Sequence, residues 1–138
     1  MENLKQKDLS GFAHTLGYHL AEWDEGFAKI ILPLNEKHYN RLHIPHGGVL
    51  ASLIDTACGY AGTYPINEQA RTAVTLSLNC QFINKAENNS ELYALGYLLG
   101  GGKTIFFSKA EIYDASNKLI ACGDGTFRYL NTIQKNNS

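Results

Sequence analysis

The sequence predicts an α+β domain in which an antiparallel sheet packs on one central helix. Three observations indicate this: one long apolar segment with helical character, several runs of alternating apolar and polar residues, and short turns between those runs. The chain has 138 residues, 44% hydrophobic and 18% charged, a size that favours a single core. Every strand needs a face to bury and only one long helix is available, so the sheet is expected to pack on that helix.

The segments before the helix are expected to be short. Residues 4–16 could form a short helix, which Gly11 weakens. Residues 18–34 are predicted to form two strands that meet at the turn of residues 24–26, because residues 27, 29 and 31 alternate with residues 28, 30 and 32 and Pro33 closes the run. Residues 35–45 are polar and are expected to form a loop.

The strongest helix prediction covers residues 47–62, before Pro65. From residue 74 the period changes to two, which predicts a long strand with the even residues from Val74 to Phe82 on one face and Thr75 and Ser77 on the other. Further strands are expected at residues 91–99, 104–113 and 119–130, with turns at residues 100–102 and 114–117. The domain is expected to span residues 4–134, followed by a frayed tail at residues 135–138.

Composition argues against several classes of partner. The chain has 12 basic and 13 acidic side chains and a net charge of -1, so neither nucleic acid nor an anionic membrane is an expected partner. The first ten residues lack the apolar core of a signal peptide, and no later stretch is long and apolar enough to span a membrane. A cytoplasmic location is therefore expected.

Cysteines and histidines do not predict a metal site or a disulfide. The three cysteines, Cys58, Cys80 and Cys122, are odd in number and far apart, so we expect them to be reduced and mostly buried packing residues. The histidines at positions 38, 43 and 46 match no metal-binding spacing. No metal ion is expected.

One carboxylate lies in the middle of the apolar helix. Asp55 falls on a stripe of small residues, Gly48, Ser52, Gly59 and Gly62, that recur every three or four positions. Such a stripe allows a ligand or another chain to come close, which favours a functional carboxylate on a contact face. The alternative is an ordinary solvated helix face.

The entry to this helix also allows two interpretations. Gly47 and Gly48 fall where the first free backbone N–H groups of the helix are expected, and such groups form anion or oxyanion sites. The alternative is that the two glycines only permit a tight entry to the helix. His46 could likewise be a catalyst, or a residue bonded into its loop.

Together these residues resemble a known family. Asn40, then His46-Gly47-Gly48, then Asp55 nine residues after the histidine, is similar to the signature of hotdog-fold acyl-CoA thioesterases of the PaaI-like and thioesterase superfamily type. The likeness extends to Lys103, within a Gly-Lys-Thr strand start, and to residues 118–129. The resemblance implies a hotdog fold, in which a curved antiparallel sheet wraps around one long central helix, and an acyl-CoA thioesterase activity.

The resemblance also implies roles for individual residues. The amide of Gly47, which follows His46 in the motif, and the side chain of Asn40 would hold the thioester carbonyl oxygen. Asp55 would come from the other protomer of a homodimer, or of a dimer of dimers, as general base or nucleophile. A hydroxyl on the following strand would assist the water, and Thr75 is the nearest match. No cofactor is implied, since coenzyme A is part of the substrate.

Substrate-binding candidates surround these catalytic ones. Four residues are candidates for contacting the acyl-CoA: Gly48, Arg71, Ser77 and Lys103. Lys103 follows three glycines, but residue 97 is a tyrosine where a phosphate-binding loop needs glycine, so a hairpin turn is predicted there. Five aromatic residues could line an acyl pocket or pack in the core: Tyr60, Tyr64, Phe82, Phe106 and Phe107.

Two other functions remain open at this point. A hotdog hydratase or dehydratase would use a histidine as base, and His43 and His46 precede the helix. A non-enzymatic acyl-CoA-binding module would bind the ligand without turnover. A thiol-release assay separates a thioesterase from both, because neither alternative liberates free coenzyme A.

Overall fold

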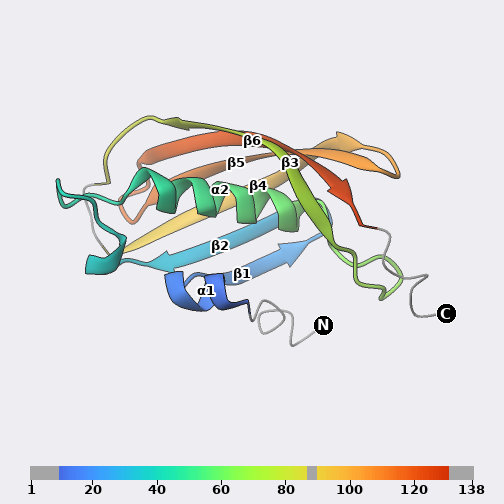
Figure 1. Cartoon of the computed structure of the whole chain (residues 1–138), viewed down its shortest axis with the longest axis horizontal. Helices are drawn as coiled ribbons and strands as arrows, with labels where there is room; N and C mark the ends of the chain where they lie inside the picture. The colour runs from blue at the N-terminus through green and yellow to red at the C-terminus, as the bar shows by residue number, and fades with distance from the viewer. Residues whose placement is uncertain (1–9, 87–89, 131–138) are drawn as a thin grey trace.

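A six-stranded antiparallel sheet curves around helix α2 (Gly47–Ala61) in the computed structural model, which describes residues 10–86 and 90–130 (Figure 1). The strand order in the sheet is β1-β2-β4-β5-β6-β3, and each neighbouring pair is antiparallel. This arrangement confirms the predicted α+β class and the hotdog fold that the resemblance implies. Strands β1 and β3 form the two edges of the sheet.

The strands lie close to their predicted positions. Their bounds are β1 His19–Asp24, β2 Phe27–Pro33, β3 Ala73–Phe82, β4 Glu91–Gly101, β5 Ile105–Asp114 and β6 Leu119–Tyr129. Helix α2 ends at the predicted glycine, Gly62, whose N–H bonds back to the last turn. The first helix, α1 (Gly11–Leu16), lies within the predicted segment and is capped by Ser10. The rest of that prediction, the ends of the predicted domain and its tail lie outside the described residues.

The loop before α2 contains an element that the sequence did not predict. A 3-10 helix, η2 (Glu36–His38), is held by a capping box between Asn35 and His38. His38 is buried; its Nδ1 accepts from the Asn35 amide at 3.1 Å and its Nε2 donates to the Leu16 carbonyl at 2.6 Å. A single turn has no apolar period to detect. These bonds fix the loop that leads into α2.

The core lies between α2 and the inner face of the sheet. Fully buried residues of the helix, such as Leu53, Ile54 and Ala57, pack on alternate residues of the strands. Strand β4 crosses the helix so closely that a Cβ on Gly96 would lie 2.2 Å from the Ala57 carbonyl oxygen. Glycine is therefore required at that crossing.

Strand β3 corrects one prediction about faces. Thr75 pairs with Phe127, but Ser77 pairs with Thr126, so Leu76 is an extra residue in a β-bulge. Side chains alternate between faces, so the bulge reverses the phase of the pattern. Thr75 shares the inner face with Phe127, whereas Ser77 lies with Thr126 on the outer face. The prediction that Thr75 and Ser77 share a face is wrong, since simple alternation cannot reveal an inserted residue.

The small-residue stripe of α2 is only partly open. A Cβ on Gly62 would lie 2.1 Å from the ring of Phe106, and one on Gly59 would lie 3.7 Å from the ring of Phe127. The two rings stack at 4.9 Å. The end of the stripe near Gly62 is thus covered by the sheet of the same chain, while Gly48 at the other end is exposed.

The cysteines are free thiols, as predicted. Cys58 is buried, and burial raises its pKa to about 12, with the charges of Asp55 and Asp124 adding to the shift. Cys80 and Cys122 are only half-buried, so the predicted burial is wrong for these two, because both lie on strands near an open sheet edge. Among the described residues, no helix has the length and apolarity needed to cross a membrane.

Candidate active site

The start of α2 offers one free backbone donor. His46 is the N-cap: its Nδ1 accepts from the Gly48 amide at 2.7 Å, and its carbonyl accepts from the Val49 amide at 2.9 Å. Within the described part of the chain, the amide of Gly47 is the one in this first turn with no hydrogen-bond partner. The amide of Gly48, predicted to be free, is occupied. The helix dipole adds positive potential at the Gly47 amide.

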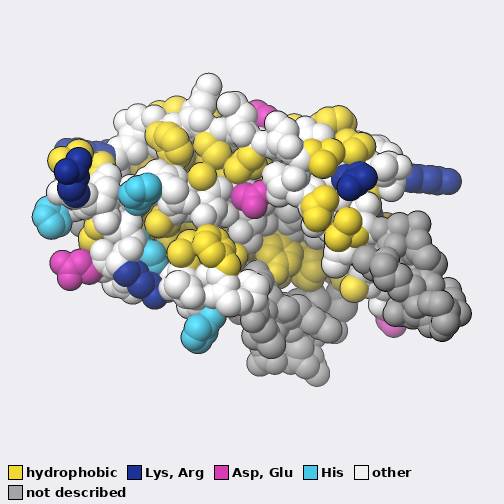
Figure 2. Space-filling model, in the orientation of Figure 1, with side chains coloured by type: hydrophobic (Ala, Val, Ile, Leu, Met, Phe, Trp, Pro, Cys, Tyr) yellow, Lys and Arg dark blue, Asp and Glu magenta, His cyan; other side chains and the backbone are white. Residues whose placement is uncertain are grey.

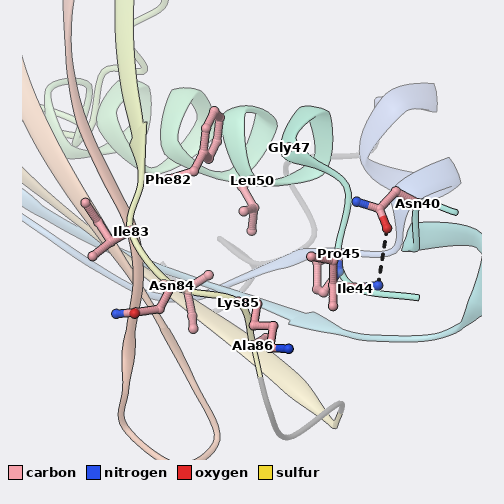
Figure 3. Close-up of a pocket in the computed structure, with 11 residues that line it drawn as sticks. Asn40, Ile44, Pro45, Gly47, Leu50, Phe82, Ile83, Asn84, Lys85 and Ala86 are labelled. Carbon is pink, nitrogen blue, oxygen red and sulfur yellow. Dashed lines mark hydrogen bonds between the residues drawn. The ribbon is translucent and has the colours of Figure 1, made fainter. Parts of the chain in front are cut away.

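Asn40 presents a second donor beside this amide. Its Oδ1 accepts from the backbone amides of Leu42 at 2.8 Å and Ile44 at 3.4 Å. Since the oxygen is used by the loop, the NH2 group of the side chain is left as a donor. Figure 3 shows this nitrogen on the side that faces the start of α2. The loop therefore fixes the orientation of the Asn40 amide.

Asn40 and Gly47 line one pocket, which we call the amide pocket, with a volume of about 310 Å³. Its other lining residues are mainly apolar (Figure 3): Ile44, Pro45, Leu50, Phe82, Ile83, Asn84, Lys85, Ala86 and Ile120. Phe82 lies against the helix start, with its ring 3.6 Å from where a Gly47 Cβ would be. The pocket thus combines two hydrogen-bond donors with apolar walls, the usual composition of a small-molecule site.

Asp55 lies in a different pocket, the carboxylate pocket, of about 290 Å³. Thr75 Oγ1 donates a hydrogen bond to Asp55 Oδ1 at 2.7 Å. The pocket is lined by Tyr18, Asp55, Thr56, Gly59, Tyr60, Thr63, Arg71, Thr72, Ala73, Thr75 and Phe127. The bulge at Leu76 places Thr75 on the inner face, where it reaches the helix. Asp55 is therefore an oriented carboxylate that is half-buried in a pocket, which favours the functional interpretation over a solvated helix face.

The two pockets are separate within one chain. Asp55 is eight residues after Gly47, which is about 12 Å along a helix axis. The pockets have no lining residue in common. One chain therefore holds its two donors and its carboxylate too far apart to act on the same carbonyl group.

The predicted substrate-binding residues are scattered. Arg71 lines the carboxylate pocket, but its Nε and Nη2 donate to the Tyr64 carbonyl at 3.1 and 3.0 Å, and its guanidinium lies 5.0 Å from the centre of the Tyr129 ring. Lys103 is exposed in the turn between β4 and β5, as predicted, and lines neither pocket. Ser77 lies on the outer face of the sheet, outside both pockets.

The aromatic candidates divide between pockets and packing. Tyr60 lines the carboxylate pocket and Phe82 the amide pocket. Phe106 is buried in the core, and Phe107 is exposed on the outer face. Tyr64 packs edge-on against Trp23 at 5.5 Å.

Two further residues of the carboxylate pocket, Tyr18 and Phe127, were not predicted as site residues. Tyr18 directly precedes β1, at the start of the segment predicted to form two strands, and a strand pattern does not indicate a pocket. Phe127 follows the inward alternation of β6, which indicates burial but not a pocket.

The chemistry available is that of donors and a carboxylate. Paired donors can stabilise an oxyanion that develops on a carbonyl, and a positioned carboxylate can take a proton from water or attack the carbonyl carbon. His46 contributes by holding the first turn of α2 through Nδ1. Within residues 10–86 and 90–130, no three potential metal ligands lie together.

Comparisons with known proteins point to one family. The profile of the family described as "Thioesterase superfamily" matches residues 43–121. The chain is 30% identical over 109 residues to the acyl-coenzyme A thioesterase PaaI of Escherichia coli, covering 79% of this chain and 75% of that protein. It is 28% identical over 96 residues to the mouse acyl-coenzyme A thioesterase 13, covering 69% and 67%.

Solved structures show the same architecture. The E. coli PaaI protein superposes with a TM-score of 0.80 at 27% identity, covering 91% of this chain and 88% of that one. A thioesterase from Haemophilus influenzae superposes with a TM-score of 0.83 at 24% identity, covering 94% and 90%. The second likeness supports the fold alone.

Proposed function

The chain belongs to the thioesterase superfamily, and from this we propose that it hydrolyses an acyl-CoA thioester to the free acid and coenzyme A. The carbonyl oxygen would bind to the Gly47 amide and the Asn40 NH2 group. Asp55 would act on the same carbonyl as general base or nucleophile. The observation that carries the proposal is that the Gly47 amide and the Asn40 NH2 group are both left available in one pocket.

The proposed reaction balances with these groups alone. In the general-base route, water attacks the carbonyl carbon and its proton passes to Asp55, while the two donors stabilise the oxyanion. The intermediate then collapses, the C–S bond breaks, and the thiolate of coenzyme A leaves and takes up a proton. In the nucleophile route, Asp55 attacks the carbonyl carbon, the C–S bond breaks and the thiolate of coenzyme A leaves and takes up a proton. Water then cleaves the resulting anhydride, which releases the free acid and restores the Asp55 carboxylate.

A homodimer would complete the site, because one chain keeps its two pockets apart. Strand β3 is an edge strand that runs from Thr75, beside Asp55, to Phe82, beside Gly47. If two copies of β3 pair antiparallel, the Asp55 end of one copy meets the Gly47 end of the other. Two equivalent sites would result. A dimer of such dimers is compatible with the same pairing.

Apolar exposure on β3 supports this pairing. Leu76 is 53% exposed and Phe82 is 56% exposed. A long edge strand with exposed apolar side chains favours pairing with another chain. Light scattering is expected to give at least a dimer, and a stable, fully active monomer would contradict the proposed shared site.

Thr75 is proposed as a positioning residue for Asp55. Replacing Thr75 with valine keeps the shape and removes the hydrogen bond, so kcat is expected to fall roughly tenfold to a hundredfold, the usual value of a bond to a charged group. KM should change little. Thr75→Ser keeps the hydroxyl and should restore most of kcat. Equal losses in both variants would contradict the positioning role.

The direct test of the function is hydrolysis of a panel of acyl-CoA thioesters, with released coenzyme A measured by a colorimetric thiol reagent. Release of the thiol from at least one acyl-CoA is expected. Binding without release would favour a non-enzymatic module. Consumption of an enoyl-CoA without release would indicate a hydratase.

A further inference from the structure

The carboxylate pocket extends beyond the reacting groups, along α2 towards the end of the helix. From Asp55 its lining residues continue through Gly59 on the helix to Thr63, which follows the C-cap. Tyr18, Tyr60 and Phe127 provide aromatic walls. Neither the carboxylate nor the donors require this extension, so a part of the substrate is its natural occupant.

The charges around the two pockets indicate which one binds the phosphate groups of coenzyme A and which one binds the acyl group. Coenzyme A carries several phosphate groups, which bind best near cations and helix N-termini. Lys85 lines the amide pocket, and Arg41 lines the cleft beside it that shares Asn40. Figure 2 shows Lys, Arg and His side chains gathered at the left end of the molecule, where α2 begins.

The carboxylate pocket is less suited to a polyanion. It holds the charge of Asp55 and lies towards the C-terminal end of α2, where the helix dipole is negative. Arg71 is the one Lys or Arg among the described residues that line it, and it already directs two nitrogens to the Tyr64 carbonyl. A neutral acyl group fits there better than the phosphate-bearing arm.

Gly59 lines this pocket beside the ring of Phe127. It is one turn after Asp55 and therefore on the same face of the helix, about 6 Å further along the axis. A Cβ at this position would meet the Phe127 ring at 3.7 Å, an ordinary van der Waals contact. A methyl group would thus fit without displacing the ring, but it would occupy space between the helix and Phe127.

We propose that the carboxylate pocket receives the acyl group and that Gly59 sets the length of acyl group that can enter it. This inference rests on the proposed thioesterase function. A short acyl group would end before Gly59, whereas a longer one would lie along the pocket surface that Gly59 and Phe127 form, towards Thr63. The volume of about 290 Å³ is near the lower end of the roughly 300–1,000 Å³ typical of ligand pockets. Short and medium acyl groups are therefore the expected substrates.

Gly59→Ala tests the assignment. Its kcat/KM for octanoyl-CoA is expected to fall at least about tenfold relative to that for acetyl-CoA, the cost of one misplaced methyl group in a tight pocket. The melting temperature should stay the same or rise, because alanine favours a helix over glycine. Gly11→Ala is the matched control: nothing lies within 4 Å of its new methyl group, so the ratio should not change.

A second variant predicts the opposite shift. Thr56 lines the same pocket, and its side chain makes only a long hydrogen bond, 3.4 Å, to the Tyr18 hydroxyl. Thr56→Ala should widen the pocket and raise the octanoyl-to-acetyl ratio of kcat/KM. If Gly59→Ala does not fold, the ratio measured for Thr56→Ala tests the assignment of the pocket on its own.

The outcomes separate the two proposals. Opposite shifts in the two variants support the assignment of the pocket. An unchanged ratio in an active Gly59→Ala protein, or an equal loss for all acyl lengths, overturns that assignment and leaves the thioesterase function standing. A wild-type protein that hydrolyses no acyl-CoA overturns both.

Discussion

Asp55→Asn is expected to lower kcat for acyl-CoA hydrolysis by at least about a hundredfold, the usual contribution of a general base. Asparagine has the same shape as aspartate, but it neither takes a proton from water nor attacks a carbonyl at a useful rate. Its amide oxygen can still accept from Thr75 Oγ1, which lies 2.7 Å from Asp55 Oδ1 in the native protein. The fold and the oligomeric state should therefore be preserved, and steady-state kinetics with circular dichroism checks both.

A matched control separates this effect from a general loss of charge. Asp124 is an exposed carboxylate on the outer face of β6, where it pairs with Asn79 and lines neither pocket. Asp124→Asn should keep the activity within a few-fold of wild type. Wild-type rates in the Asp55→Asn protein would end the assignment of Asp55 as the reacting carboxylate.

Asn40→Asp is the second substitution with a large expected effect. The new carboxylate keeps an oxygen for the amides of Leu42 and Ile44, so the loop should hold its shape. It removes the NH2 donor and places negative charge beside the proposed oxyanion. Loss of one such donor typically costs about a hundredfold to a thousandfold in kcat, and the added repulsion should bring the loss to at least that level.

The control for this change is Asn117→Asp. Asn117 is exposed in the turn between β5 and β6 and lines neither pocket, and its φ of 68° is a conformation that aspartate also tolerates. It should leave kcat unchanged. An Asn40→Asp enzyme that folds and keeps near-native kcat would show that the Asn40 amide does not contact the reacting carbonyl.

Much of the fold could be predicted from patterns that local physics imposes. The two-residue period between residues 91 and 130 and the long apolar segment after Gly47 correspond to β4 to β6 and to α2. These patterns are reliable because each element must bury one face. The bulge at Leu76 could not be foreseen, because apolar and polar residues alternate in the sequence without a break on both sides of Leu76. It decides that Thr75 and not Ser77 reaches the helix.

The site was predictable in its residue types and less so in its geometry. Asp55 was notable as a carboxylate in an apolar helix, and the glycines after His46 indicated free amides. The sequence could not show that Nδ1 of His46 accepts a hydrogen bond from the Gly48 amide, so that the Gly47 amide is the one available to a ligand. It also could not show that Phe106 and Phe127 cover the end of the glycine stripe, because contacts between distant segments leave no local pattern.

In the proposed enzyme, the two donors and the carboxylate act together only across two chains. The most direct measurement mixes the Asp55→Asn and Asn40→Asp proteins after unfolding, refolds them together and measures hydrolysis. In a mixed dimer one site would carry both defects and the other would carry neither. Random pairing makes half of the dimers mixed, so about a quarter of wild-type activity is expected to return. Activity no higher than that of the separate variants, despite mixed dimers detected by mass spectrometry, would show that the site is not shared between two chains.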